Sequence, residues 1–142
     1  MSAPANCVFC RIVAGEIPAA VVFQNASLIA FLDVGPLAEG HLLVVPTTHC
    51  ESLTDLAPET AAELGRMLPR FGRALVEVTG SEGFNILQND GPAAGQVVPH
   101  VHFHLIPRRA GDNLGYRWLP GEYSEGRAGI IAAEFQKRLL TT

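Results

Sequence analysis

The stretch PHVHFHLIPR, residues 99–108, places a histidine at every second position with one apolar residue between each pair. Side chains alternate between the two faces of a β-strand, so this pattern predicts a strand at 97–107 with all three histidines on one face, at steps of about 6.6 Å. The histidines are His100, His102 and His104, and the residues facing the other way are Val101, Phe103 and Leu105. One side of the strand is therefore expected to anchor it in a core, while the other presents three imidazoles.

The chemistry of imidazole leaves three interpretations of this face. It could be a polar surface, but the whole chain has only five histidines, so chance does not readily place three of them together. It could be a three-histidine zinc centre with one position open for water, although adjacent strand positions seldom let three imidazoles converge on one ion. Finally, one neutral imidazole could attack phosphorus near pH 7 and form a covalent intermediate, with a second handling the phosphate and a third holding structure.

Periodicity around this strand predicts an α+β fold. A short helix is expected at 8–13, a β-hairpin at 21–24 and 28–32, and further strands at 41–45 and 84–88. Apolar residues at three- and four-residue steps predict one long helix that starts at Pro58, bends at Pro69 and stops at 80–83. The loop at 89–95 would join antiparallel neighbours, and a tail that is irregular at 111–123 would end in a helix at 125–140. This order indicates a mainly antiparallel sheet with one long helix and a C-terminal helix.

Composition and charge describe a globular chain of one domain. Its 142 residues suit a single core, 48% of them are apolar, and no low-complexity run indicates disorder. A formal charge of -4 and a single lysine, Lys137, argue against a nucleic-acid polymer as the ligand, because that binding needs clustered basic groups. The chain has no signal-peptide pattern and no apolar stretch long enough to cross a bilayer. We therefore expect a cytoplasmic protein with no membrane partner.

Cys7 and Cys10 have the spacing of half a zinc site. In a reducing compartment they are better explained as metal ligands or redox groups than as a disulfide. A thioredoxin-like redox pair would follow a strand inside a βαβ unit, and only six residues precede Cys7. The spacing by itself supplies two ligands of the four that a structural zinc ion needs.

The segment 100–106 has the pattern His-φ-His-φ-His-φ-φ, where φ is apolar, and resembles the signature of the histidine-triad (HIT) family. The resemblance also covers 7–11, 31–33, 40–41, 46–49 and 91–108, which is most of the chain from 7 to 109. It implies a single HIT-like domain over 1–142 with its core at about 7–109, and it constrains the tail at 110–142 poorly. The cysteine pair is similar to that of the bacterial zinc-containing, Hint-like branch, whereas the loop at 90–96 is Fhit-like.

In this family the middle histidine attacks the α-phosphorus of a nucleotide conjugate, so the resemblance implies His102 as the nucleophile and a nucleotidyl-histidine as the intermediate. His104 would contact the phosphate oxygens. His41 would support the histidine cluster by hydrogen bonding, since a partner on one ring nitrogen fixes the tautomer and leaves the other nitrogen free to react.

The resemblance also implies a nucleotide site. The Asp33 carboxylate would accept hydrogen bonds from the ribose hydroxyls. The residues expected around the base are Phe9, Ile12, Phe31, Leu32 and Val34. Those expected around the phosphate are Asn89, Gly95, Gln96 and Val97, in a loop whose glycines let the backbone approach closely. Many relatives carry serine or threonine at the position of Val97, so the loss of this hydroxyl predicts an altered rate or substrate preference.

Bacterial-type relatives complete the cysteine pair with a distant histidine and the first histidine of the motif. The ligands implied for a structural Zn²⁺ are therefore Cys7, Cys10, His49 and His100. Four protein ligands make a closed tetrahedral site, which is structural and not catalytic.

The resemblance thus implies a nucleotide-binding hydrolase or transferase acting at the α-phosphate of nucleoside conjugates, with phosphoramidates such as an AMP-amine as the first substrate class. The rival within the same chemistry is a dinucleoside polyphosphate hydrolase. Two alternatives from other classes are a nucleotide-binding regulatory module with little turnover and a zinc-water hydrolase. The family normally forms homodimers through the long helix and a strand of each subunit, so a homodimer is expected here.

Overall fold

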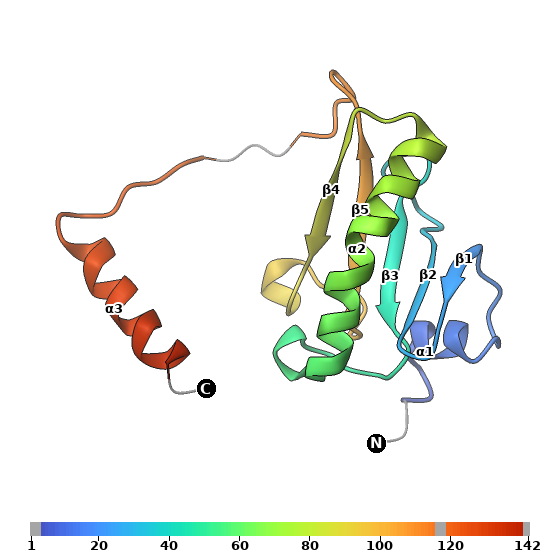
Figure 1. Cartoon of the computed structure of the whole chain (residues 1–142), viewed down its shortest axis with the longest axis horizontal. Helices are drawn as coiled ribbons and strands as arrows, with labels where there is room; N and C mark the ends of the chain where they lie inside the picture. The colour runs from blue at the N-terminus through green and yellow to red at the C-terminus, as the bar shows by residue number, and fades with distance from the viewer. Residues whose placement is uncertain (1–3, 116–118, 141–142) are drawn as a thin grey trace.

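A five-stranded antiparallel sheet, in the order β1-β2-β3-β5-β4, forms the centre of the computed structural model (Figure 1), which describes residues 4–115 and 119–140. Its strands are β1 (Val21–Gln24), β2 (Leu28–Leu32), β3 (Leu42–Pro46), β4 (Gly83–Gln88) and β5 (Phe103–Arg108). The predicted hairpin is β1–β2, and the predicted antiparallel neighbours of the 89–95 loop are β4 and β5. The α+β class expected from the sequence is confirmed.

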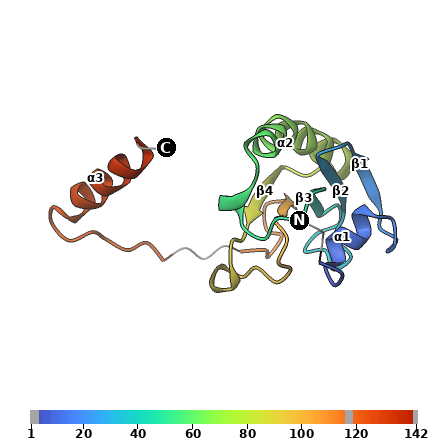
Figure 2. The ribbon, with the colours of Figure 1, turned by 90° about the horizontal axis from the view of Figure 1, so that it is seen from below.

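The long helix α2 (Pro58–Thr79) covers one face of this sheet (Figures 1 and 2). Pro58 lies in the first turn, where a missing N–H costs no helical hydrogen bond, and Gly80 ends the helix with a left-handed φ of 63°. Pro69 lies inside the helix, as expected. The core between helix and sheet consists of Leu28, Ala30, Leu42, Val44, Leu64, Met67, Phe71, Leu75 and Leu105.

The short helix α1 (Val8–Val13) lies on the opposite side of the sheet from α2 (Figure 2). A second core on this side consists of Cys7, Phe9, Ile29, Phe31, Leu43 and Val45. Neighbouring residues of one strand therefore enter different cores, as the alternation of strand side chains requires. Only those side chains of β2, β3 and β5 that face α1 can therefore contribute to a site on that side of the sheet.

The strand predicted at 97–107 is shorter in the structure, where β5 begins only at Phe103. The β3–β5 ladder ends at Val44 and Phe103, because the groups beyond it bond elsewhere. The Val101 N–H donates to the Cys50 carbonyl at 2.7 Å, and the His100 N–H donates to the Val98 carbonyl at 2.8 Å. The prediction of three histidines in one continuous strand is therefore wrong, since only His104 lies in β5.

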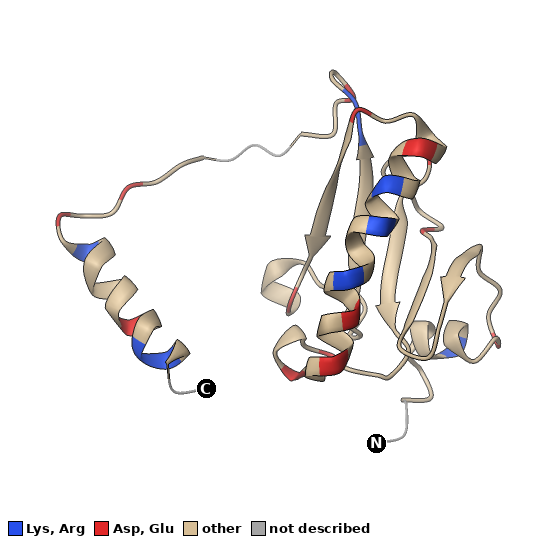
Figure 3. Cartoon of the chain, viewed as in Figure 1, with Lys and Arg blue, Asp and Glu red and all other residues tan. Residues whose placement is uncertain are grey.

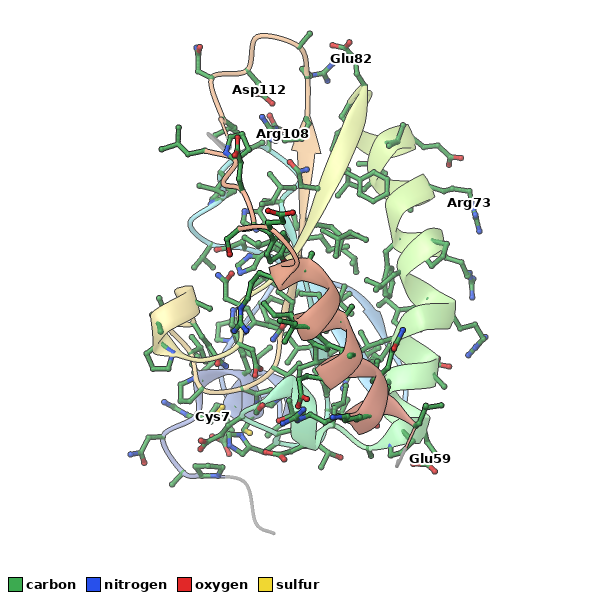
Figure 4. The ribbon with its side chains drawn as sticks, turned by 90° about the vertical axis from the view of Figure 1, so that its left-hand side faces the viewer. Cys7, Glu59, Arg73, Glu82, Arg108 and Asp112 are labelled. Carbon is green, nitrogen blue, oxygen red and sulfur yellow. The ribbon has the colours of Figure 1, made fainter. Side chains whose placement is uncertain are left out.

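The tail leaves β5 through a hydrogen-bonded turn and carries α3 (Arg127–Leu139) away from the sheet (Figures 1 and 2). Arg108 Nε donates to Asp112 Oδ2 at 2.7 Å, and both residues are labelled in Figure 4. The helix predicted at 125–140 is thus present, and 111–115 and 119–123 contain no helix or strand. The remaining part of the predicted irregular tail, 116–118, lies outside the described residues.

Charged residues are distributed along both exposed helices. Basic residues occupy the middle of α2, and acidic residues lie toward its two ends (Figure 3). Among the described residues, every helix is too short or too polar to span a bilayer.

Candidate active site and metal centre

A cavity of about 720 Å³ opens on the α1 side of the sheet. It is bounded by α1, by the turn after β2, by the face of β5 that carries His104, and by the loop after β4. The predicted site residues that line it are Phe9, Ile12, Phe31, Asp33, Val34, His41, Asn89, Gly95, Val97, His102 and His104. Residues from five separate segments are thus brought to one concave surface, as a small-molecule site requires.

His102 is buried beside the cavity and is held by a backbone carbonyl. Its Nδ1 lies 2.7 Å from the carbonyl oxygen of His100, so Nδ1 carries the proton and donates it. The ring of Phe9 packs edge-on against this imidazole, with 5.1 Å between the ring centroids. Nε2 of His102 has no hydrogen-bond partner among the described residues and is not fully buried. In this tautomer the lone pair of the ring is on Nε2, and His102 lines the cavity.

His41 and His104 form a hydrogen-bonded imidazole pair in the same cavity. His41 Nε2 lies 2.9 Å from His104 Nδ1, and the Leu37 N–H donates to His41 Nδ1 at 3.1 Å. Burial lowers the pKa of His41 below 6.5, against the opposing charge of Asp33. Burial, and then the neighbouring His102 and His41, lower the pKa of His104 to about 4. Both rings are consequently neutral near pH 7.

Asp33 follows β2 at the mouth of the cavity, with its side chain 20% exposed. Its Oδ1 accepts the Gly35 N–H at 2.8 Å, and its Oδ2 lies 3.7 Å from His41 Nε2. One carboxylate oxygen therefore shapes the turn, and the other retains acceptor capacity. Asp33, His41 and His104 place ligand-type atoms within 4.8 Å of one another, but the direct hydrogen bond between the two imidazoles accounts for that proximity.

The loop after β4 is held in shape by Gln96. Its Oε1 accepts the Gly91 N–H at 2.7 Å, while its Nε2 donates to the carbonyls of Glu51 and Val98 at 2.9 and 3.1 Å. Gly91 and Gly95 take φ values of 85° and 94°, which side chains disfavour. Gln96 does not line the cavity described above, because its amide is engaged with the backbone; the structure places it as a brace of the loop.

Leu32 is another predicted base-pocket residue that the structure places elsewhere. It lines a separate cavity against α2 with Val22 and Val78, on the opposite face of the sheet from Phe31. The cause is the strand alternation, which sends consecutive side chains of β2 to different faces. Val97, in contrast, lines the active-site cavity with 89% of its surface exposed.

Several cavity residues were not predicted. They are Val8, Ile17, Pro18, Ala19, Gly35, Leu37, Leu43, Leu87, Val98 and Ile106. Ile106 could have been found from its place two residues after His104 in the same alternation. Ile17, Pro18 and Ala19 carry no such signal, because a turn and not a strand brings them to the cavity.

The side chains of Cys7, Cys10, His49 and His100 form a separate Cys/His cluster. Cys7 Sγ lies 3.3 Å from His100 Nδ1, Cys10 Sγ lies 3.6 Å from the same nitrogen, and Cys10 Sγ lies 3.4 Å from His49 Nδ1. The ligand atoms of all four side chains are within 4.8 Å of one another. Cys7 is labelled in Figure 4 at the end of the molecule away from Arg108 and Asp112.

The spacing and the tautomer of this Cys/His cluster fit a tetrahedral zinc ion. Zn–S and Zn–N bonds of about 2.3 and 2.0 Å at a tetrahedral angle give S···N separations of about 3.5 Å, which the cluster matches. His100 Nε2–H donates to the Pro46 carbonyl at 2.8 Å, so its Nδ1 presents a lone pair to the cluster. Burial, and then the neighbouring Cys7, raise the pKa of Cys10 to about 11. Cys50 is not part of the cluster, and its Sγ–H donates a hydrogen bond to the Ser52 carbonyl instead.

Comparison with known proteins identifies the family. The family model described as HIT domain matches residues 14–111. Adenosine 5'-monophosphoramidase hnt1 of Schizosaccharomyces pombe is 39% identical over 135 residues, covering 94% of this chain and 98% of its own. A solved member of the HIT family from Bacillus subtilis is 36% identical with a TM-score of 0.88, covering 94% of this chain and 96% of its own.

A zinc-bound histidine triad family protein from Mycobacterium smegmatis is similar to this chain as well. It is 40% identical with a TM-score of 0.73, and covers 92% of this chain and 97% of its own. The fold of this chain matches the folds of these two solved structures. The chain belongs to the HIT family.

Proposed function

We propose that the protein hydrolyses or transfers nucleoside monophosphate groups through a covalent intermediate on His102. The observation that carries this proposal is the hydrogen bond from His102 Nδ1–H to the His100 carbonyl at 2.7 Å. It leaves Nε2 as an unprotonated nitrogen beside a cavity of nucleotide size. A neutral imidazole in this tautomer is a competent nucleophile near pH 7.

The reaction proceeds in two displacements at the α-phosphorus. In the first, the lone pair of His102 Nε2 forms an N–P bond while the bond from phosphorus to the leaving group breaks, and an amine leaving group takes up a proton from solvent. In the second, a water oxygen attacks the same phosphorus and gives up a proton to solvent while the N–P bond breaks, which releases the nucleoside monophosphate and restores His102. His104 contacts the phosphate oxygens, and the backbone N–H groups of the loop at 89–96 supply further donors.

Nucleoside phosphoramidates are the first substrate class. The support is the name of the Schizosaccharomyces pombe relative, an adenosine 5'-monophosphoramidase that matches nearly the whole chain. The apolar wall formed by Phe9, Ile12 and Phe31 suits a base, and Asp33 Oδ2 has the acceptor capacity that ribose hydroxyls need.

Intact mass spectrometry tests the intermediate directly. Wild type and His102→Ala are each mixed briefly with an adenosine phosphoramidate and quenched at intervals. The wild type is expected to carry a transient adenylyl adduct that the variant lacks, whereas His104→Ala retains the nucleophile and serves as the matched control. Turnover without any trapped adduct at high enzyme concentration would instead favour direct attack by water.

A dinucleoside polyphosphate hydrolase remains the second candidate, because the loop at 90–96 is Fhit-like and Val97, which follows it, lines the cavity with 89% of its surface exposed. Product analysis separates the two activities, since an amine leaves in one and a nucleotide in the other. A regulatory module with little turnover would bind AMP equally well in wild type and His102→Ala, with no adduct in either.

We infer that Cys7, Cys10, His49 and His100 hold a structural Zn²⁺. The support is the S···N spacing of the cluster, the lone pair that the Pro46 carbonyl fixes on His100 Nδ1, and the zinc-bound relative. Bound zinc would tie α1 to the segment that carries His102, and it would accept electron pairs from four protein ligands with no open position. Metal analysis of protein purified without chelators tests this inference, and a metal-free wild type would remove it.

We also propose that the chain forms a homodimer. β4 is an edge strand of the sheet, and Phe84 and Ile86 on it are 37% and 45% exposed. An unpaired strand edge beside apolar side chains favours association with another chain. Light scattering across a concentration series measures the assembly, and a monomer at all concentrations would contradict the proposal.

A further inference from the structure

Two neighbouring imidazoles in the cavity are held by opposite kinds of backbone group. His102 Nδ1 faces a carbonyl, the His100 oxygen at 2.7 Å, which can only accept a proton. His41 Nδ1 faces an amide, the Leu37 N–H at 3.1 Å, which can only donate one. The two backbone groups therefore impose opposite tautomers on the rings that they contact.

The effect of the Leu37 amide passes from His41 to His104. Because His41 Nδ1 accepts, the single proton of this neutral ring is on Nε2. His41 Nε2 then donates to His104 Nδ1 at 2.9 Å, and His104 in turn carries its proton on Nε2. Among the described residues, no group is hydrogen-bonded to His104 Nε2, and this nitrogen is not fully buried. His104 lines the cavity, so Nε2–H is a donor available to a ligand.

We propose that the backbone N–H of Leu37 is a positioning group that fixes His104 as an N–H donor toward the substrate's phosphate. The same cavity thus contains one imidazole set as a nucleophile, His102, and one set as a hydrogen-bond donor, His104. The inference rests on the proposed function only in naming phosphate as the acceptor; the tautomers follow from the hydrogen bonds.

The segment that carries Leu37 is ordered by its own hydrogen bonds. Asp33 Oδ1 accepts the Gly35 N–H at 2.8 Å, and the Asp33 N–H donates to the His41 carbonyl at 2.9 Å. The His41 N–H donates to the Ala38 carbonyl at 3.0 Å. These bonds close the turn from β2 to β3 so that the Leu37 amide points at the His41 ring. Burial of His41, 3% exposed, opposes a second proton on that ring.

The proposal has a chemical consequence for the leaving group. A backbone amide does not release its proton under these conditions, so nothing behind His41 can replace a proton that His104 gives away. His104 therefore stabilises negative charge on phosphate by donating a hydrogen bond and does not act as the acid that protonates the leaving group. Substrates with an amine leaving group and substrates whose leaving group needs no proton depend on it equally.

Nitrogen NMR of histidine-labelled protein tests the tautomers without any substrate. The wild type is expected to show His41 and His104 protonated on Nε2 and His102 protonated on Nδ1. Leu37→Pro removes the amide N–H and should give mixed tautomers at His41 and His104 while His102 is unchanged; Leu37→Ala keeps the amide and should match the wild type. A wild-type His104 protonated on Nδ1, or a Leu37→Pro spectrum identical to the wild type, would overturn the proposal.

Kinetics with two substrates give a second readout. One hydrogen bond to a charged group predicts a loss of about tenfold in kcat/KM for Leu37→Pro, equal for an adenosine phosphoramidate and for an adenylate with a leaving group that needs no proton. A loss confined to the phosphoramidate would mean that the pair acts as an acid, which contradicts the inference. If Leu37→Pro fails to fold, the wild-type spectrum alone still decides the tautomers. The absence of any adenylyl adduct would contradict the proposed function. It would not affect the tautomers, because the NMR experiment measures them without substrate.

Discussion

Acid should destabilise this protein through His104 well before its carboxylates titrate. Burial, and then the neighbouring His102 and His41, lower the pKa of His104 from 6.5 to about 4 in the folded state. The unfolded chain therefore binds a proton below pH 6.5 that the native state does not bind until about pH 4. Since stability falls wherever the unfolded state binds more protons, the loss begins near pH 6.5 and is complete below about pH 4.

The size of this loss follows from the two pKa values. At pH 5 the unfolded imidazole is almost fully protonated and the native one is almost fully neutral, so the difference costs about 2 kcal/mol relative to pH 7. Below pH 4 the loss from this residue approaches about 3 kcal/mol. His41 changes stability in the same direction, because burial lowers its pKa as well, against Asp33.

Urea unfolding at pH 7 and pH 5 measures the effect, with His104→Gln as the matched variant. Gln preserves a polar side chain of similar size but has no proton to bind, so the variant should lose about 2 kcal/mol less than the wild type between the two pH values. Any contribution of the Cys/His cluster to the pH dependence is common to both proteins and cancels in the comparison. Equal losses in wild type and variant would refute the argument that His104 is neutral in the native state.

Three further predictions concern the core, the cluster and the loop. Gly72→Ala should lower the free energy of unfolding by about 1–3 kcal/mol in a urea titration, because the added Cβ would lie 2.4 Å from Phe84 Cζ. The control is Gly65→Ala, whose Cβ would meet open space. This variant should leave the free energy of unfolding unchanged or raise it by up to about 1 kcal/mol. Cys7→Ser should lose bound metal by elemental analysis and lower the melting temperature, and Cys50→Ser should do neither; metal retained at wild-type stoichiometry in Cys7→Ser would contradict the ligand assignment. Val97→Ser should raise kcat/KM for a phosphoramidate by up to about tenfold, because the hydroxyl adds a hydrogen-bond donor beside the cavity. Val97→Ala is the control. Equal kcat/KM values for the two variants would show that the hydroxyl has no role.

The fold was largely predictable because the signals that specify it are local. The spacing of apolar residues from Pro58 to the stop at Gly80 predicted α2, and Gly80 ends it in the left-handed conformation that glycine adopts readily. The hairpin of β1 and β2 followed from two short β-rich runs separated by three turn-forming residues, 25–27. The strand at 97–107 was overestimated because alternation alone does not reveal that the Val101 N–H donates to the distant Cys50 carbonyl and the His100 N–H donates to the Val98 carbonyl, so neither joins the ladder.

The sequence by itself determined the chemistry available to this protein: three imidazoles two residues apart, two thiols with ligand spacing, and an aspartate after a short strand. Only the tertiary structure decided which atom of each group is available. A ring nitrogen becomes a nucleophile, a donor or a metal ligand according to the group that bonds to the other nitrogen of the same ring. Those groups are the Pro46 carbonyl for His100, the His100 carbonyl for His102 and, through His41, the Leu37 amide for His104. For His100 and His104 the deciding group lies more than 50 residues away in the chain, so packing and not local pattern decides which nitrogen of these two rings is available.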